Sequence, residues 1–176
     1  MNLKTPEPAP RCNQLRVGAV TLAVVAPDDV AARVCLEAYY RELATRFEAG
    51  FDPAANPATD ADMSPPRGYF VLATLDGQAV GCGALVCARD DLSGEIKRVW
   101  TAPAVRGLGV AKRLIHRLEA IAGERGLEVV RLDTNRVLHE ARALYTKEGY
   151  REIARFNDNP YAHHWFEKRL APHSAS

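Results

Sequence analysis

Long apolar runs are missing from this 176-residue chain, and so is an excess of charge of either sign. No stretch approaches the roughly 18 consecutive apolar residues that a membrane-spanning helix needs. The 23 Lys and Arg residues nearly balance the 22 Asp and Glu residues, which leaves a formal net charge of +1. These absences argue against an integral membrane protein, and they give no bulk electrostatic reason to bind nucleic acid or a membrane surface.

Cysteine is also scarce. Only four cysteines occur, and no two of them form a C-x-x-C pair. Cys82 and Cys87 are five residues apart, so a regular strand would turn their side chains to opposite faces. The adjacent His163 and His164 would also face opposite ways, whereas paired zinc ligands share a face. We therefore expect free thiols, no metal site and a cytoplasmic location.

The residues that are present fit one ordinary domain. Hydrophobic residues make up 47% of the chain and charged residues 26%, which is close to the average of soluble proteins. Residues 1–14 hold three prolines and no apolar core, which predicts a flexible lead-in and not a secretory signal. We expect a single domain over residues 15–170 and a flexible tail over 171–176.

Hydrophobic periodicity and turn residues predict a mixed α/β chain. Helices are expected at 28–47, 111–122 and 138–149, and strands at 19–27, 69–75, 78–88, 94–102, 127–134, 150–156 and 162–170. The Asp76-Gly77 pair between two β-rich runs is a hairpin signal. The order β-α-β-β-β-α-β-α-β-β indicates a largely antiparallel front and a β-α-β unit near the middle. Along 94–102, alternation would place Ile96, Arg98 and Trp100 on one face.

The helix that follows "TAPAVRGLG" begins without a capping side chain. No Ser, Thr, Asp or Asn lies between Ala102 and Ala111, although these residue types usually satisfy the first amides of a helix. Open amides and the helix macrodipole together make a phosphate site, and Arg106 adds a forked cation. A diphosphate is therefore the expected guest. The alternative is that Gly107 and Gly109 only permit a tight turn between strand and helix.

Neither of two common phosphate motifs fits this turn. A Walker A loop needs Lys-Ser or Lys-Thr after its last glycine, and a dinucleotide fingerprint needs a third glycine. The run from Arg106 to Ala111 instead matches the Arg/Gln-x-x-Gly-x-Gly/Ala signature of the GNAT superfamily of acetyltransferases. The segment "EIKRVWTAPAVRGLGVAKRLI" resembles the fourth strand and third helix of that family, and "EARALYTKEGYREI" resembles its A-x-x-L-Y-x-x-x-G-F/Y segment.

The resemblance covers about residues 66–170, and the ending "FNDNPYAHHWFEK" is similar to that of many bacterial members. It implies the GNAT fold, a central, mixed and largely antiparallel sheet flanked by helices, with the fourth and fifth strands splayed apart. It also implies an N-acetyltransferase that uses acetyl-CoA and no metal.

The resemblance places the donor along the fourth strand and the glycine turn. Backbone groups of the strand would bind pantetheine, one amide near Val99 would polarise the thioester carbonyl, and the turn would hold the diphosphate. Many members carry an Asn where this chain has Leu138, so Asn135 is the candidate to replace it. The implied cofactor-binding residues are Val99, Trp100, Thr101, Arg106, Gly107, Leu108, Gly109, Val110, Ala111 and Asn135.

Two side chains are candidates for proton transfer. Tyr145 matches the family tyrosine that protonates the departing thiolate, since a phenol and a thiol have similar pKa values; the alternative is that it only packs in the core. Glu95 lies where several members place a carboxylate base, and the alternative is a surface or acceptor-binding carboxylate. Asp133 is a weaker candidate for the base.

Acceptor specificity in this family comes from residues that correspond here to 36–68 and 156–165. Arg67 is a candidate to meet a carboxylate, and Tyr40, Tyr161 and Trp165, together with Tyr39, are candidates for an aromatic wall, although each could equally be ordinary packing. We expect a small-molecule amine, amino-acid-like or not, as the acceptor. A protein N-terminus or lysine, an alcohol, and a non-catalytic acyl-CoA-binding module are the alternatives, and the sequence leaves a homodimer open.

Overall fold

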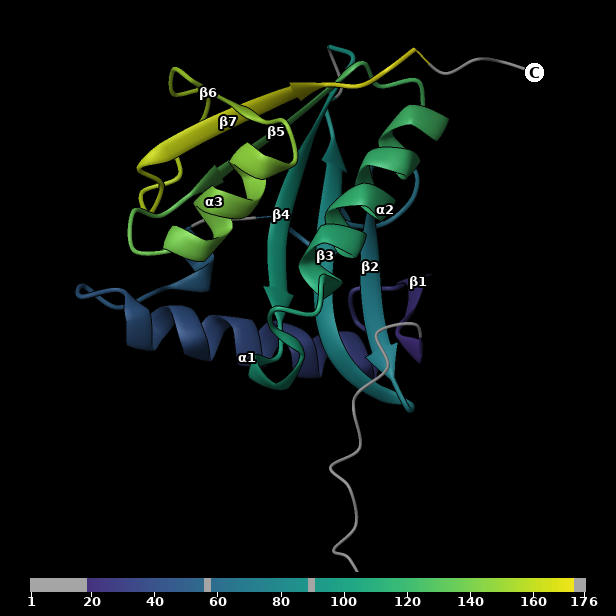
Figure 1. The fold of residues 1–176 in the computed structure, drawn as a ribbon, viewed down its shortest axis with the longest axis vertical. Helices are drawn as coiled ribbons and strands as arrows, with labels where there is room; N and C mark the ends of the chain where they lie inside the picture. The colour runs from purple at the N-terminus through teal and green to yellow at the C-terminus, as the bar shows by residue number, and fades with distance from the viewer. Residues whose placement is uncertain (1–18, 56–57, 89–90, 173–176) are drawn as a thin grey trace, which may run out of the picture.

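One seven-stranded sheet organises the chain (Figure 1). The computed structural model describes residues 19–55, 58–88 and 91–172. The elements are β1 (Thr21–Val25), α1 (Val30–Arg46), η2 (Pro53–Ala55), β2 (Gly68–Leu75), β3 (Gln78–Cys87), β4 (Ser93–Thr101), η3 (Pro103–Val105), α2 (Val110–Glu124), β5 (Val129–Thr134), α3 (His139–Lys147), β6 (Arg151–Ile153) and β7 (His164–Arg169). This order agrees with the prediction, while the predicted lead-in and most of the tail lie outside the described residues.

The strands run in the order β1-β2-β3-β4-β5-β7-β6. Every neighbouring pair is antiparallel except β4 and β5, which are parallel and are joined through α2. The β4–β5 ladder covers only three residue pairs, from Ser93 opposite Val129 to Glu95 opposite Arg131. Beyond these pairs the two strands separate (Figure 1). The mixed sheet and the splayed fourth and fifth strands are therefore confirmed.

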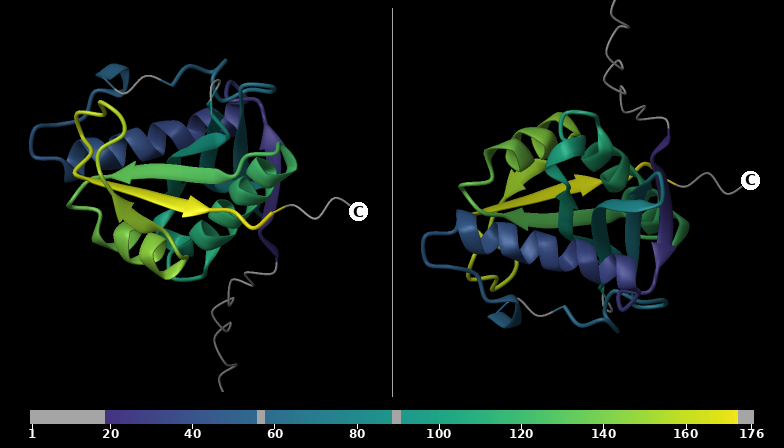
Figure 2. Two further views of the ribbon diagram at one scale, coloured as in Figure 1. Left: turned by 90° about the horizontal axis from the view of Figure 1, so that it is seen from above. Right: turned by 90° about the horizontal axis from the view of Figure 1, so that it is seen from below.

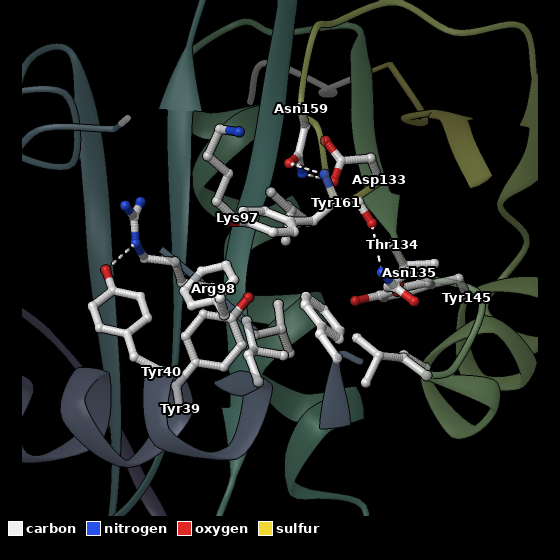
Figure 3. Close-up of a pocket in the computed structure, with 17 residues that line it drawn as sticks. Tyr39, Tyr40, Lys97, Arg98, Asp133, Thr134, Asn135, Tyr145, Asn159 and Tyr161 are labelled. Carbon is white, nitrogen blue, oxygen red and sulfur yellow. Dashed lines mark hydrogen bonds between the residues drawn. The ribbon is translucent and has the colours of Figure 1, made fainter. Parts of the chain in front are cut away.

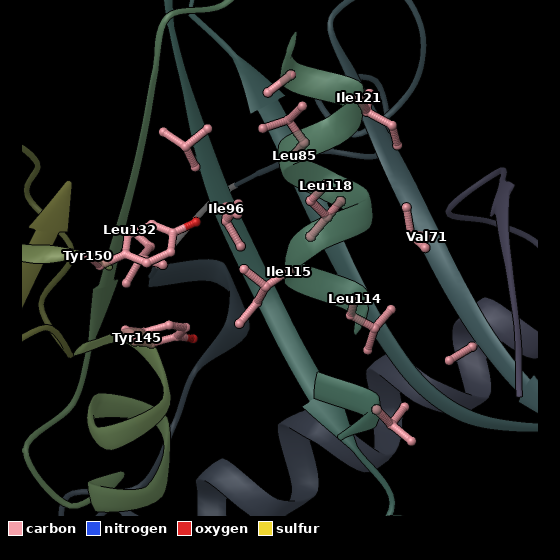
Figure 4. Close-up of a cluster of buried hydrophobic side chains, with 14 of the residues drawn as sticks. Val71, Leu85, Ile96, Leu114, Ile115, Leu118, Ile121, Leu132, Tyr145 and Tyr150 are labelled. Atoms are coloured by element: carbon pink, nitrogen blue, oxygen red, sulfur yellow. The ribbon is translucent and has the colours of Figure 1, made fainter. Parts of the chain in front are cut away.

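The helices cover the two faces of the sheet unequally, as Figure 2 shows. On one face α1 buries Cys35 and Leu36 against β2 and β3. On the other face α2 buries Leu114, Ile115 and Leu118 completely in the larger core (Figure 4). Truncating such a leucine to alanine typically costs about 2–5 kcal/mol, so this contact fixes α2, and with it the start of α2, against the sheet.

A β-bulge interrupts β4 at Arg98. Arg98 has a φ of 56°, and the pairing with β3 shifts register between Cys82 and Ala84. Before the bulge Ile96 packs on the α2 side, and after it Trp100 packs on the α1 side. The predicted common face for Ile96, Arg98 and Trp100 is therefore wrong, because one extra residue reverses the alternation.

Local signals placed most element ends correctly. Asp29 caps α1 by accepting hydrogen bonds from the amides of Ala31 and Ala32, at 2.8 and 3.4 Å. Asp76 and Gly77 both have positive φ values, as a type I′ hairpin turn requires. Cys82 and Cys87 pack into opposite cores, as predicted. None of the described helices has the length and apolar character that crossing a membrane requires.

Candidate active site

The start of α2 leaves backbone amides without a side-chain cap. Gly109 is the N-cap residue, in the left-handed region at φ 80° and ψ 11°, and it provides no capping group. The first hydrogen bond into the helix runs from the Arg113 amide to the Gly109 carbonyl, at 3.1 Å. The amides of the first three helical residues, 110–112, therefore point out of the helix end, where the macrodipole favours an anion.

The two glycines of this turn are required by conformation. Gly107 and Gly109 have φ values of 77° and 80°, which side chains with a Cβ rarely adopt. A Cβ added at either position would meet no atom within 4 Å. The two glycines therefore do permit a tight turn between strand and helix. The open space beside them is also what an approaching diphosphate needs.

Arg106 is already engaged by the protein. Its Nε and Nη2 donate to the Thr101 carbonyl at 3.1 and 3.0 Å, and Nη2 also reaches Glu42 Oε2 at 2.5 Å. Burial raises the pKa of Glu42, but hydrogen bonds from Trp100 and Arg106 and nearby positive charge outweigh it, so the net pKa is lowered. Glu42 is therefore a firm anionic partner for the residue that we expected to meet phosphate.

The edge of β4 beyond the bulge faces the gap to β5. The Ala102 amide donates to the Val80 carbonyl at 2.8 Å, toward β3. Because consecutive strand residues turn their backbone groups to opposite edges, those of Thr101 and Val99 face the gap. This is where the sequence predicted pantetheine to bind. The Trp100 side chain lies elsewhere, since its Nε1 donates to Glu42 at 2.8 Å on the α1 side.

A cavity occupies the space between the splayed strands, α1, α3 and the β6–β7 connection (Figure 3). Val99 and Tyr145 line one part of it, and Lys97 and Asp133 line the strand walls. Aromatic rings from α1, from the loop after it and from Tyr161 line the remainder. The cavity thus connects the predicted donor edge to the predicted acceptor segments.

Tyr145 is both a core residue and a lining residue of this cavity. It is 7% exposed, and its ring contacts the rings of Tyr150 and Phe166 at centroid distances of 5.9 and 6.0 Å (Figure 4). Burial, and to a smaller degree the charge of Asp133, raises the pKa of Tyr145. The phenol therefore stays protonated, but it is a weaker acid than the sequence-based match with a thiol assumed.

Asparagines tie the two candidate base carboxylates together. Asn157 Nδ2 donates to Glu95 Oε1 at 2.9 Å and to Asp133 Oδ2 at 2.6 Å, and Asn159 donates to Asp133 Oδ1 at 2.7 Å. Glu95 also forms an ion pair with Lys97 at 2.6 Å. Asp133 lines the cavity of Tyr145, whereas Glu95 lines a neighbouring recess that shares Lys97 and Asn159. The structure thus brings Asp133 closer to the predicted chemistry than Glu95.

The predicted aromatic wall exists in part. Tyr40 and Tyr161 line the cavity and contact Phe51 at 5.7 and 4.9 Å between ring centroids. Trp165 does not line the cavity, and its Nε1 instead donates to Asn157 Oδ1 at 2.9 Å. Phe51 and its neighbour Phe47 were missed by the sequence reasoning, although an aromatic inside a Pro- and Asp-rich loop was a usable signal.

Two further predicted residues have local partners. Arg67 forms an ion pair with Asp62 and does not line the cavity. Asn135 lines the cavity, but its side chain joins two backbone segments, donating to the Tyr161 carbonyl at 2.7 Å and accepting from the Val137 amide at 3.0 Å. Asn135 therefore shapes the cavity wall through hydrogen bonds within the protein.

Comparison with known proteins identifies the family. Residues 36–150 match the model of the acetyltransferase (GNAT) family. An IAA acetyltransferase of Azospirillum brasilense is 33% identical over 99 residues, which cover 56% of this chain and 63% of that protein. The matched part is thus less than two thirds of the length of this curated relative.

Solved structures of the same family share the fold. A GNAT-family acetyltransferase of Staphylococcus aureus has a TM-score of 0.76 at 18% identity, over 87% of this chain and all of that one. An aminoglycoside 6′-N-acetyltransferase in complex with coenzyme A has a TM-score of 0.64 at 16% identity, over 88% of this chain and 99% of that one. With the family match over more than half of its length, the chain belongs to the GNAT family of acetyltransferases, which use acetyl-CoA.

Proposed function

We propose that this protein transfers the acetyl group of acetyl-CoA to the primary amine of a small molecule, by direct attack within a ternary complex. The observation that carries the proposal is the single cavity that joins the free edge of β4 and Tyr145 to Asp133 and the aromatic residues. In such a cavity, the amine and the thioester are held within reach of each other, which is the main requirement of a transfer without a covalent enzyme intermediate.

The residues present fit the donor. Uncapped amides at the start of α2 suit a diphosphate, and the backbone of Val99 and Thr101 at the open edge of β4 suits the amides of a pantetheine arm. Bound acetyl-CoA would supply the thioester carbon that the amine attacks. The Val99 amide would stabilise the negative charge that develops on the thioester oxygen. Arg106 would exchange the Thr101 carbonyl for phosphate oxygens.

Proton transfer in this proposal is divided between the two walls of the cavity. Asp133 accepts a proton from the amine, directly or through water, as the C–N bond forms. Tyr145 donates its phenolic hydrogen toward the sulfur as the C–S bond breaks, and it is reprotonated from solvent. The products are an N-acetylated amine, the CoA thiol and one proton released per ammonium consumed. Glu95 supports Asp133 indirectly, because both carboxylates accept hydrogen bonds from the side-chain amide of Asn157.

An acceptor screen tests this function. The protein is incubated with acetyl-CoA and a panel of amines, amino acids, aminoglycosides and lysine-containing peptides, and thiol release is followed together with product mass. We expect amine-dependent thiol release and an acetylated small molecule. Acetyl-CoA binding in calorimetry without thiol release from any acceptor would identify a binding module instead, and acetylation of peptides alone would identify a protein acetyltransferase.

A further inference from the structure

The cations that line the cavity already have partners within the protein. Lys97 is paired with Glu95 at 2.6 Å. Arg98 donates from Nε to the Tyr40 hydroxyl at 2.7 Å and from Nη2 to the Ala58 carbonyl at 3.2 Å. Glu95 neutralises Lys97, whereas the partners of Arg98 carry no charge but direct its guanidinium toward Tyr40 and away from Asp133 (Figure 3). The cavity is therefore poorly prepared for an acceptor that carries a carboxylate next to its amine.

Two of the tyrosines in the aromatic lining have their hydroxyl groups engaged by the protein, while Tyr39 and Tyr145 line the cavity within electrostatic reach of Asp133. The Tyr161 hydroxyl accepts a hydrogen bond from the Asp52 amide at 2.8 Å, and the Tyr40 hydroxyl accepts from Arg98. Phe51 lies between these two rings and also contacts Phe47 at 5.9 Å. With the hydroxyls of Tyr40 and Tyr161 engaged, these two rings and Phe51 offer an apolar surface that suits another aromatic ring.

Asp133 is the only carboxylate among the described residues that line this cavity. Amide groups of Asn157 and Asn159 donate to both of its oxygens and so fix its orientation. A fixed negative charge opposite a wall of aromatic rings favours a cation that carries an apolar body. It also repels a second negative charge on the same ligand.

We propose that the acceptor is an arylalkylamine, a primary amine on a short chain attached to an aromatic ring, with no carboxylate. Asp133 binds the ammonium and the rings around Phe51 bind the aromatic body. The amine nitrogen forms the new C–N bond, the C–S bond breaks, and the products are the N-acetyl arylalkylamine, the CoA thiol and a proton. This inference rests on the proposed function, which it narrows to one class of amine.

Three matched amines separate these features: phenethylamine, L-phenylalanine, which adds a carboxylate, and n-butylamine, which lacks the ring. With acetyl-CoA saturating, we expect kcat/KM for phenethylamine to exceed that for each of the others by at least about tenfold. Equal or faster turnover of L-phenylalanine or butylamine would overturn the inference and leave the proposed function standing. Failure of every amine in the acceptor screen, these three included, would overturn both the inferred acceptor class and the proposed function.

A variant tests the aromatic wall itself. Phe51→Leu keeps an apolar side chain but removes the ring, so KM for phenethylamine should rise about three- to tenfold, while KM for butylamine stays unchanged. Acetyl-CoA affinity and melting temperature serve as controls for folding. An equal rise in KM for both amines, or none for either, would show that Phe51 only packs the loop and would contradict the assigned acceptor class.

Discussion

The two halves of the cavity are built from different parts of the chain. The donor half consists mainly of backbone, namely the bulged edge of β4 and the uncapped start of α2, which lie close together in the sequence. The acceptor half consists of side chains from α1, the loop after it, β5 and the β6–β7 connection. A backbone site persists when most side chains change, whereas a side-chain site changes with each substitution. One donor can therefore be combined with many acceptors on the same fold.

The largest expected effect distinguishes between the two candidate bases, Asp133 and Glu95. If Asp133 takes the amine proton, Asp133→Asn should lower kcat by about 10²–10⁴-fold, the usual range for general base catalysis. Glu95→Gln keeps an acceptor for Asn157 and should cost only about tenfold. Steady-state kinetics with a saturating amine measure both. The reverse ranking would make Glu95 the base, as the sequence first suggested.

The donor half is tested by adding charge to the glycine turn. Asn and Asp both tolerate the left-handed conformation of Gly109 and have nearly the same shape, but only Asp adds a negative charge. Gly109→Asp should bind acetyl-CoA on the order of 100-fold more weakly than Gly109→Asn, since like charges a few ångströms apart repel by a few kcal/mol. Calorimetry gives both affinities, and equal values would remove the diphosphate from the start of α2.

Tyr145 lies where the two halves meet. Tyr145→Phe keeps the ring contacts with Tyr150 and Phe166 and deletes only the hydroxyl. Because burial raises the pKa of this phenol, we expect a loss in kcat of roughly 10- to 100-fold, at or below the low end for general acids. Acetyl-CoA affinity and melting temperature should stay the same. Wild-type turnover under conditions where chemistry limits the rate would make Tyr145 a core residue only.

The smallest effect concerns Glu42, which connects α1 to the donor half through Arg106. Glu42→Gln keeps an acceptor for Trp100 but weakens the hold on Arg106, which frees its guanidinium for the diphosphate. Acetyl-CoA affinity should rise about two- to fivefold, as expected for one partly exposed ion pair. The gain should vanish when Arg106 is also changed to alanine. A lower affinity for Glu42→Gln alone would mean that Glu42 instead holds Arg106 ready for the ligand.

The sequence predicted the donor half better than the acceptor half, for a physical reason. The turn at Gly107 and Gly109 and the helix after it depend on neighbouring residues, so a local pattern specifies them. The partner that engages Arg106 is Glu42, which lies 64 residues earlier, and no local pattern contains such a pair.

The acceptor half depends almost entirely on contacts between residues that are far apart in the sequence. Asn157 joins Glu95, 62 residues earlier, to Asp133, and it became visible only when the strands were placed side by side. The family resemblance implied a bulge that splays the fourth and fifth strands, but not its position at Arg98, because alternation along a strand reveals its period and not the residue at which pairing with β3 slips.

The central claim is that donor and acceptor meet in one cavity and react directly. Initial rates measured while acetyl-CoA and the best amine of the screen are both varied test it most directly. A ternary complex predicts intersecting lines in double-reciprocal plots and no acetylated protein after incubation with acetyl-CoA alone. Parallel lines, together with a protein that carries the acetyl group, would show a covalent intermediate and contradict direct attack.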